Sequence, residues 1–234
     1  MFSYYGSKSK IVGYYPPPKH KRIIEPFAGS ARYSLKYWQN DVLLVDKYDV
    51  IVKIWNWLKT ASVNDVLKIP EPKIRERINI NDFDCEEQFL LMSFVIKSGS
   101  ATPSTKVCSN RGQEGQISSI LKTISNNLFK IRHWNIILDD YRNLENTEST
   151  WFIDPPYQFG GEHYKESSKK LNFIELAEWC KSRNGQTIVC ENTKADWLPF
   201  KPMVDMQGVM FKTTEAIWSN HQTNYDAVQQ SLQF

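Results

Sequence analysis

The residues best placed to do chemistry are Asp154, Pro155, Pro156 and Tyr157, which follow the apolar run 149–153. The β-prone residues of this run predict a strand, and the two prolines end it abruptly. Ligands of open α/β sheets bind just outside the carboxyl ends of strands. An acid beside exposed carbonyl oxygens can accept two hydrogen bonds from one amino group, and a tyrosine ring can stack on a flat ring. The pattern favours a planar base with an exocyclic amine as the ligand.

A second candidate site begins at Glu25, because residues 22–31 read as a strand, a tight loop of small residues and the start of a helix. Gly29 and its small neighbours let a backbone approach a ligand closely, in front of a helix N-terminus. Asp46 ends the buried run 42–45, at a distance from Gly29 close to that of the ribose-binding acid in dinucleotide folds. The three-glycine fingerprint is absent, which favours a nucleoside-type cofactor without a pyrophosphate. Both acids are also compatible with ordinary turns or strand-end caps, so the rest of the chain must decide.

Length and composition predict a globular protein with one domain, or one domain and a small insertion, since the chain has 234 residues and eight tryptophans. No apolar run reaches the roughly 18 residues needed to span a bilayer, and the first residues lack the apolar core of a signal peptide. The four cysteines are widely spaced, so we expect reduced thiols without a zinc site. Together these features predict a cytoplasmic protein.

The net charge of +3 does not by itself indicate nucleic acid, but the basic residues are clustered. Residues 1–22 hold five lysines and arginines and no acid, and residues 97–132 hold six against one acid. Phosphate contacts are a natural use of such segments, although a solvated arm or helix face remains an alternative. A polar segment at 158–170, with Gly160 and Gly161, resembles a mobile lid. The expected DNA-binding residues are Lys97, Lys106, Arg111, Lys122, Tyr164 and Lys165.

Alternating strands and helices predict an α/β domain with a mostly parallel sheet and an antiparallel edge strand. Strands are expected at the start of 22–31 and at 42–45, 135–138, 149–153, 186–191, 206–212 and 215–219. Helices are expected at 32–40, 50–58, around 74–78, 86–96, 117–132, 173–183 and near 196–199.

Three stretches occur together and in order: Tyr4 to Lys8, Glu25 to Ser30, and Asp154 to Tyr157. In this the chain resembles the DNA adenine-N6 methyltransferases of the Dam-like alpha group (D12 class). Their pattern is aromatic-x-Gly-Gly-Lys, Asp/Glu-Pro-Phe-x-Gly-Ser/Gly and Asp-Pro-Pro-Tyr. The resemblance implies a Rossmann-like class I methyltransferase fold. It also implies a catalytic domain at 1–50 and 131–234, with a helical insertion at 51–130 as a reduced target-recognition region.

The resemblance implies methyl transfer from S-adenosylmethionine to the N6 amine of an adenine flipped out of double-stranded DNA. Asp154 and the Pro155 carbonyl would hold the amine, with Pro156 beside them, and Tyr157 would stack on the base. Asp46 would bind the ribose hydroxyls and Asp140 would lie near the cofactor's adenine, with Asp139 as the weaker match. The cofactor-binding residues would be Tyr4, Tyr5, Lys8, Glu25, Pro26, Phe27, Ala28, Gly29, Ser30, Asp46, Asp140 and Asp154. No metal is required.

Two departures from the family pattern limit this interpretation. Ser7 stands where the family has its second glycine, and the segment between Asp46 and Asp140 is short for a full recognition domain. We therefore expect relaxed specificity or a partner protein for target recognition, in a monomer or weak dimer. Alternatives are an RNA methyltransferase, a cytosine-N4 methyltransferase (where Ser is more common than Asp154) and an inactive DNA-binding relative. A solitary enzyme, a phage protective enzyme and half of a restriction pair are equally compatible with the sequence.

Overall fold

The computed structural model describes most of the chain, and the statements below concern that part. The described residues are 2, 4, 6–73, 75–97, 101–108, 115–207 and 212–221. Two residues of the predicted site, Tyr5 and Arg111, lie outside them.

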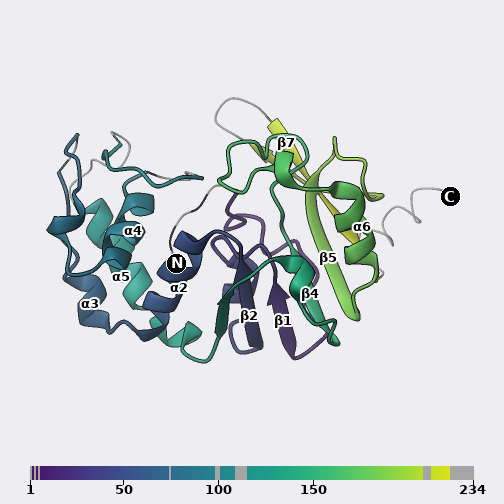
Figure 1. The fold of residues 1–234 in the computed structure, drawn as a ribbon, viewed down its shortest axis with the longest axis horizontal. Helices are drawn as coiled ribbons and strands as arrows, with labels where there is room; N and C mark the ends of the chain where they lie inside the picture. Colours follow the sequence, from purple (N-terminus) through teal and green to yellow (C-terminus); the bar gives the residue numbers. More distant parts are fainter. Residues whose placement is uncertain are drawn as a thin grey trace.

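Within the described part, seven strands form one sheet in the order β3-β2-β1-β4-β5-β7-β6. All pair in parallel except β7, which is antiparallel to β5 and β6. This is the strand order of the Rossmann-like class I methyltransferase fold, and the predicted fold class is confirmed. The antiparallel strand lies one place in from the edge (Figure 1). The strands are β1 (Arg22–Glu25), β2 (Asp41–Asp46), β3 (Asn135–Leu138), β4 (Ser149–Ile153), β5 (Gly185–Asn192), β6 (Lys201–Gln207) and β7 (Lys212–Ser219).

Strand β4 shows why the central strands are continuous apolar runs. All five of its residues are buried, as expected for a parallel strand covered on both faces. Since successive side chains point to opposite faces, Phe152 enters one apolar cluster while Trp151 and Ile153 enter another. The ring of Phe152 stacks on Tyr33, with ring centroids 4.2 Å apart. The core therefore has two layers, one on each side of the sheet.

The helices divide between these two layers. Helix α2 packs against β2 and β3, and α3, α4 and α5 form a group beyond it, at the left of Figure 1. Helix α6 contacts β5 and lies on the other side of the sheet, at the right. The helices are α1 (Arg32–Lys36), α2 (Asp49–Thr60), α3 (Val63–Leu67), α4 (Glu86–Val95), α5 (Gln116–Ser125) and α6 (Phe173–Lys181).

Two predicted helices are wrong. Around 74–78, the described residues form a turn and a bridge between Arg77 and Lys106. The helix forms earlier, at α3, because the Ser62 and Asp65 side chains make a capping box at its start. Near 196–199 the chain turns instead, and the Asp196 N–H donates to the side chain of Gln158.

Several further boundaries differ from the prediction, among them the end of α1, which lies at Lys36 rather than Asn40. The helix expected to reach Arg132 ends at Ser125 and is followed by the 3-10 helix Leu128–Ile131. Strand β6 starts at Lys201 rather than Met206, and contains Pro202 beside an irregularity in its pairing. Proline lacks an N–H, and an edge strand tolerates this because one side of its ladder is unpaired. Strand β7 accordingly starts at Lys212, three residues before the predicted start.

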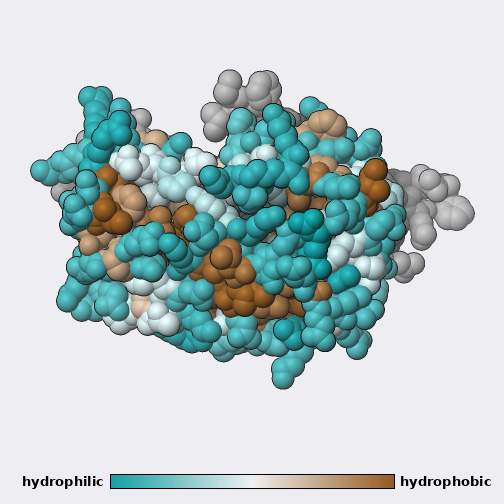
Figure 2. All heavy atoms as spheres, viewed as in Figure 1, coloured by the Kyte–Doolittle hydropathy of each residue, from teal (hydrophilic) through white to brown (hydrophobic). Residues whose placement is uncertain are grey.

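The side of the sheet near β3 is thinly covered, because only the 3-10 helix Tyr141–Asn143 connects β3 to β4. Ile137 and Leu138 remain exposed on β3, as does Phe129 before it. Figure 2 has the same orientation as Figure 1. It shows apolar side chains gathered below the centre of the molecule, where Figure 1 places β1 and β2. None of the helices among the described residues has the length and apolar character needed to cross a membrane.

Trp55 of α2 links the core to the glycine loop. It is fully buried beside Phe2 and Trp134, and its Nε1 donates to the Gly29 carbonyl oxygen at 2.8 Å. We expect Trp55→Phe to lower the free energy of unfolding by about 1–3 kcal/mol, because the partly buried Gly29 carbonyl loses its donor. Urea unfolding measures this loss. The control is Trp57→Phe on the same helix, where the side chain is only partly buried. An equal loss in both variants would contradict the role given to this hydrogen bond.

Candidate active site

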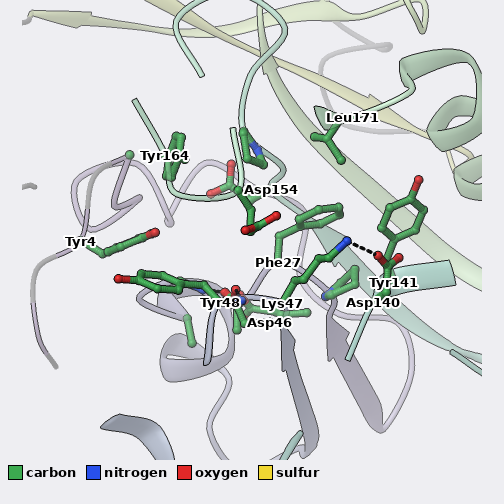
Figure 3. A pocket seen from close by; sticks show the side chains of 18 of the residues that line it. Tyr4, Phe27, Asp46, Lys47, Tyr48, Asp140, Tyr141, Asp154, Tyr164 and Leu171 are labelled. Carbon is green, nitrogen blue, oxygen red and sulfur yellow. Dashed lines mark hydrogen bonds and ion pairs between the residues drawn. The ribbon is translucent and has the colours of Figure 1, made fainter. Parts of the chain in front are cut away.

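The loops that follow four adjacent strands converge on one pocket. Residues after β1, β2, β3 and β4 line it, so it lies outside the carboxyl edge of the sheet, where the strand order reverses between β1 and β4. Its volume of about 160 Å³ exceeds by roughly tenfold the space that one water needs, so a sizeable ligand fits. In Figure 3, Tyr4 and Tyr48 lie on one side, Phe27 and Asp154 in the middle, and Asp140 and Tyr141 on the other side.

The glycine loop is held by Asp46. One carboxylate oxygen of Asp46 accepts from the Gly29 N–H at 3.0 Å, and the other accepts from the Tyr48 N–H at 2.9 Å. Gly29 has a φ of +44°, and a Cβ there would lie 3.1 Å from the Tyr4 ring. Only glycine meets both conditions easily. Burial raises the pKa of Asp46 to about 6, although the backbone N–H groups partly oppose this rise.

Glu25 ties the same loop to helix α1. It is 2 % exposed and lines the pocket, and its Oε1 accepts from the Ser34 N–H at 2.6 Å. That N–H is one of the first four of a helix, which have no partner within the helix itself. Burial raises the pKa of Glu25 to about 8, and its hydrogen bonds offset this only in part. The carboxyl group is thus held protonated over much of the neutral range.

Asp140 is paired at the far end of the pocket. Lys47 donates to its Oδ2 at 2.9 Å, as the dashed line in Figure 3 marks, and Arg142 donates to both carboxylate oxygens. Arg142 and then Lys47 hold the pKa of Asp140 well below its usual range. Asp139 also lines the pocket, but its Oδ1 accepts from Asn143 and from the Asp140 N–H.

A buried polar network surrounds Asp154. The ammonium of Lys8, 6 % exposed, lies 3.0 Å from Asp154 Oδ1 and 3.4 Å from Glu215 Oε1, and also donates to the Tyr157 hydroxyl. The side chain of Asp154 is 23 % exposed and opens into the pocket. Burial raises the pKa of Asp154 to about 6, Lys8 opposes this, and Glu215 adds to it. Burial lowers the pKa of Lys8, but the two carboxylates outweigh it and the net direction is upward.

The structure brings most of the predicted cofactor and catalytic residues into this one place. Tyr4, Lys8, residues 25–30, Asp46, Asp140, Asp154 and Pro156 all line the pocket. Pro155 is buried beside them, and Tyr157 turns its ring toward Lys8, whose ammonium lies 4.4 Å from the ring centroid. Glu215 and Tyr15 belong to the same network and were not among the predicted site residues. The sequence offers two signals for Glu215: it begins the predicted strand 215–219, and residues 215–220 resemble the closing strand of the Dam-like family.

The predicted DNA-binding residues are divided. Tyr164 lines the pocket and packs against Tyr4, with ring centroids 5.8 Å apart, and Lys165 is exposed on the same lid segment. Lys106 and Lys122 are exposed and Lys97 half-buried, all in the region of α4 and α5 and outside the pocket lining. The structure thus separates the lid aromatic from the lysines of the helical region.

Comparison with known proteins adds a weak structural likeness. No family model matches the sequence, and no curated protein matches it either. Among solved structures, yhhF of Escherichia coli, provisionally described as a methyltransferase, is similar over 92 % of this chain and 81 % of its own, with 8 % identity and a TM-score of 0.37. A conserved hypothetical protein of Streptococcus pyogenes is similar over 86 % and 88 %, with 11 % identity and a TM-score of 0.34. The fold assignment rests on the strand order.

Glu25 predicts how stability depends on pH. Its pKa is about 8 when folded against an ordinary 4.5, so the stability from its bound proton is complete below pH 4.5 and is lost as the pH rises through 8. We expect Glu25→Gln to keep an acceptor for Ser34 and to abolish this loss. The free energy of unfolding of the variant minus that of the wild type should therefore increase by roughly 4 kcal/mol from pH 4.5 to pH 8.5. Urea unfolding across this range measures it, and a constant difference would refute it.

Gly161 of the lid packs directly on the backbone after Asp154. A Cβ there would lie 2.7 Å from the Tyr157 nitrogen and 2.8 Å from the Pro156 carbonyl carbon, which is closer than real contacts. We expect Gly161→Ala to displace the lid and weaken ligand binding in the pocket by about tenfold or more. The control is Gly13→Ala, whose Cβ would meet nothing nearer than Lys36 Nζ at 4.0 Å. Calorimetric titration with S-adenosylhomocysteine compares them, and unchanged affinity in Gly161→Ala would refute the packing argument.

Proposed function

We propose that this protein is an S-adenosylmethionine-dependent methyltransferase that acts on the N6 amine of adenine in double-stranded DNA. The observation that carries the proposal is one pocket lined both by the Gly29 loop and by Asp154 and Pro156, with Pro155 and Tyr157 next to them outside its lining. A nucleoside cofactor and a planar amine substrate need adjoining sites of these two kinds. Both groups of residues lie outside the carboxyl edge of the sheet, which supports the proposal.

The residues present suit the proposed cofactor. Glycine at φ +44° lets the loop backbone face the pocket, and a Cβ there would press on Tyr4. Asp46 lines the pocket at the end of β2 and would bind the ribose hydroxyls. Phe27 and Tyr141 give the pocket an apolar end, with ring centroids 5.4 Å apart. Acids in the pocket complement the positive charge of a sulfonium. When bound, S-adenosylmethionine supplies an electrophilic methyl group and leaves as a neutral thioether.

The residues of the chain then address the weakness of the nucleophile. An adenine amine reacts poorly because its lone pair is delocalised into the ring. Asp154 and the Pro155 carbonyl would each accept one N–H, drawing the nitrogen toward tetrahedral geometry and stabilising its developing charge. When the amine takes up the methyl group, its surplus proton would pass to Asp154 and from there to water. The lid around Tyr164 would exclude solvent while the groups are held in line.

A base cannot reach this pocket from within a duplex, so we propose base flipping, at a cost of a few kcal/mol. Phosphate contacts from exposed Lys106, Lys122 and Lys165 would offset part of that cost. The recognition part would be the helical insertion 51–130, and its small size favours a short target or a partner protein. RNA is the second candidate substrate, since a pocket for a flipped base is the same for both nucleic acids. Cytosine-N4 is less favoured, because Asp154 stands where such enzymes more often have Ser.

The direct test is transfer of labelled methyl from S-adenosylmethionine to unmethylated duplex DNA and to RNA of the same sequence. We expect label at adenine N6 of the DNA, and a loss of about 100-fold or more in Asp154→Ala because the amine loses an acceptor. The rate should rise with pH through about 6, since Asp154 must be ionised to accept both the hydrogen bond and the proton.

Three other outcomes would each change the proposal in a different way. Cofactor binding with label only in RNA would change the substrate. Cofactor binding without transfer would favour an inactive relative or a missing partner. The absence of cofactor binding would rule out the enzyme altogether.

A further inference from the structure

Glu215 is a buried acid in the site that the proposed chemistry does not use. It is 1 % exposed, and its Oε1 accepts from the hydroxyls of Tyr15, at 2.6 Å, and of Tyr157. The same oxygen lies 3.4 Å from the Lys8 ammonium. An oxygen that faces three donors is well suited to be an ionised carboxylate. Glu215 therefore binds Lys8, which also contacts Asp154, and Tyr157, which lies three residues after Asp154.

We propose that Glu215 is a positioning residue for the proposed methyl transfer. When the target amine binds to Asp154, the Lys8 ammonium moves away from Asp154 and pairs with Glu215 alone. Glu215 also holds the Tyr157 hydroxyl in place. The proposal rests on the proposed function, because it assigns the target amine to Asp154. Glu215 acts through Lys8 and Tyr157 and touches no reacting atom.

Competition for one carboxylate explains the need for such a residue. Lys8 lies 3.0 Å from Asp154 Oδ1, so the ammonium and the proposed target amine would share the Asp154 carboxylate. Without Glu215, a Lys8 ammonium that moved away from Asp154 would be a buried charge with no carboxylate beside it, which carries a large energetic cost. Glu215 removes this cost, since a short shift of Nζ exchanges one carboxylate for the other. Asp154 is then freed while Lys8 stays paired.

The direction of β7 is what places Glu215 here. Glu215 lies near the start of β7 and pairs with Asn192 at the end of β5. Because β7 runs antiparallel, its beginning lies at the carboxyl edge of the parallel strands, beside Asp154. A parallel strand would bring only its own end to that edge. Tyr15 supports the arrangement, since its hydroxyl donates to Glu215 and its ring packs against Phe152, with ring centroids 5.1 Å apart.

The charged and titratable groups around Asp154 set the direction of the test. Lys8 lowers the pKa of Asp154 and Glu215 raises it, so their removal should move that pKa in opposite directions. The groups that face Asp154 are Lys8 and Tyr15 of the N-terminal segment, Glu25 of β1, Tyr157 of its own loop, Cys190 and Glu191 of β5, and Glu215 of β7.

The test compares Glu215→Gln, Lys8→Met and the control Glu191→Gln. Glu191 is also buried, on neighbouring β5, but it accepts from Gln158 and Trp197. The first readout is the carbon-13 titration of the Asp154 carboxyl group without cofactor, with the signal assigned by its loss in Asp154→Asn. We expect Asp154 to titrate at lower pH in Glu215→Gln, at higher pH in Lys8→Met, and with a smaller downward change in Glu191→Gln than in Glu215→Gln.

The second readout is methyl transfer. We expect Glu215→Gln to lower kcat/KM for the nucleic acid by about 10- to 100-fold, the worth of a hydrogen bond to a charged group, with cofactor affinity within twofold of the wild type. Glu215→Asp keeps the charge but withdraws the carboxylate, so it should lose activity while the Asp154 titration stays near wild type. This variant also serves if Glu215→Gln does not fold.

An unchanged Asp154 titration together with unchanged transfer in Glu215→Gln would overturn the proposal. A loss of cofactor affinity as large as the loss of transfer would also overturn it, since Glu215 would then act on the cofactor pocket. If the wild type transfers no methyl group, the proposed function fails, and the titration still decides whether Glu215 and Lys8 hold Asp154 as described.

Discussion

The burial of one ammonium group is the constraint on which the rest of the site depends. Lys8 lies almost entirely out of water, so its charge must be compensated by carboxylates within reach. Asp154 at the end of β4 and Glu215 at the start of β7 provide this. The pairing fixes the N-terminal segment to two strands that are far apart in the sequence. It also sets the charge state of the acid that the proposed chemistry requires.

The sheet supports this arrangement by gathering polar residues at one edge. Asp46 holds the Gly29 loop, Glu25 caps α1 and Asp140 binds two cations, each just after or at the end of a parallel strand. Parallel strands end together, so the acids lie around one pocket instead of along a surface. Several of them have raised pKa values because the pocket withholds water. Such raised values are typical of functional sites, where burial adjusts acids to their task.

The remainder of the chain divides its roles by region. Residues of the lid, with Tyr164 and Gly161, close over the pocket and contact the backbone after Asp154. The helices α3 to α5 lie to one side of the sheet, and their region includes exposed Lys106 and Lys122. A pocket with a separate basic region is suited to a substrate that inserts one group while its bulk lies outside. This is the geometry that the proposed nucleic acid substrate requires.

The sequence alone determined the fold class, because runs such as 149–153 and 42–45 specify buried strands that alternate with amphipathic helices. It also identified the residues at strand ends, since Pro155 and Pro156 stop a strand wherever it lies. It could not locate the helix at Val63–Leu67, which depends on a local capping box, or the start of β6. Only the tertiary structure brought Glu215 to Asp154, because an antiparallel strand reverses which of its ends reaches the active edge. Such a contact joins residues 207 positions apart along the chain (Lys8 to Glu215), and no local pattern encodes it.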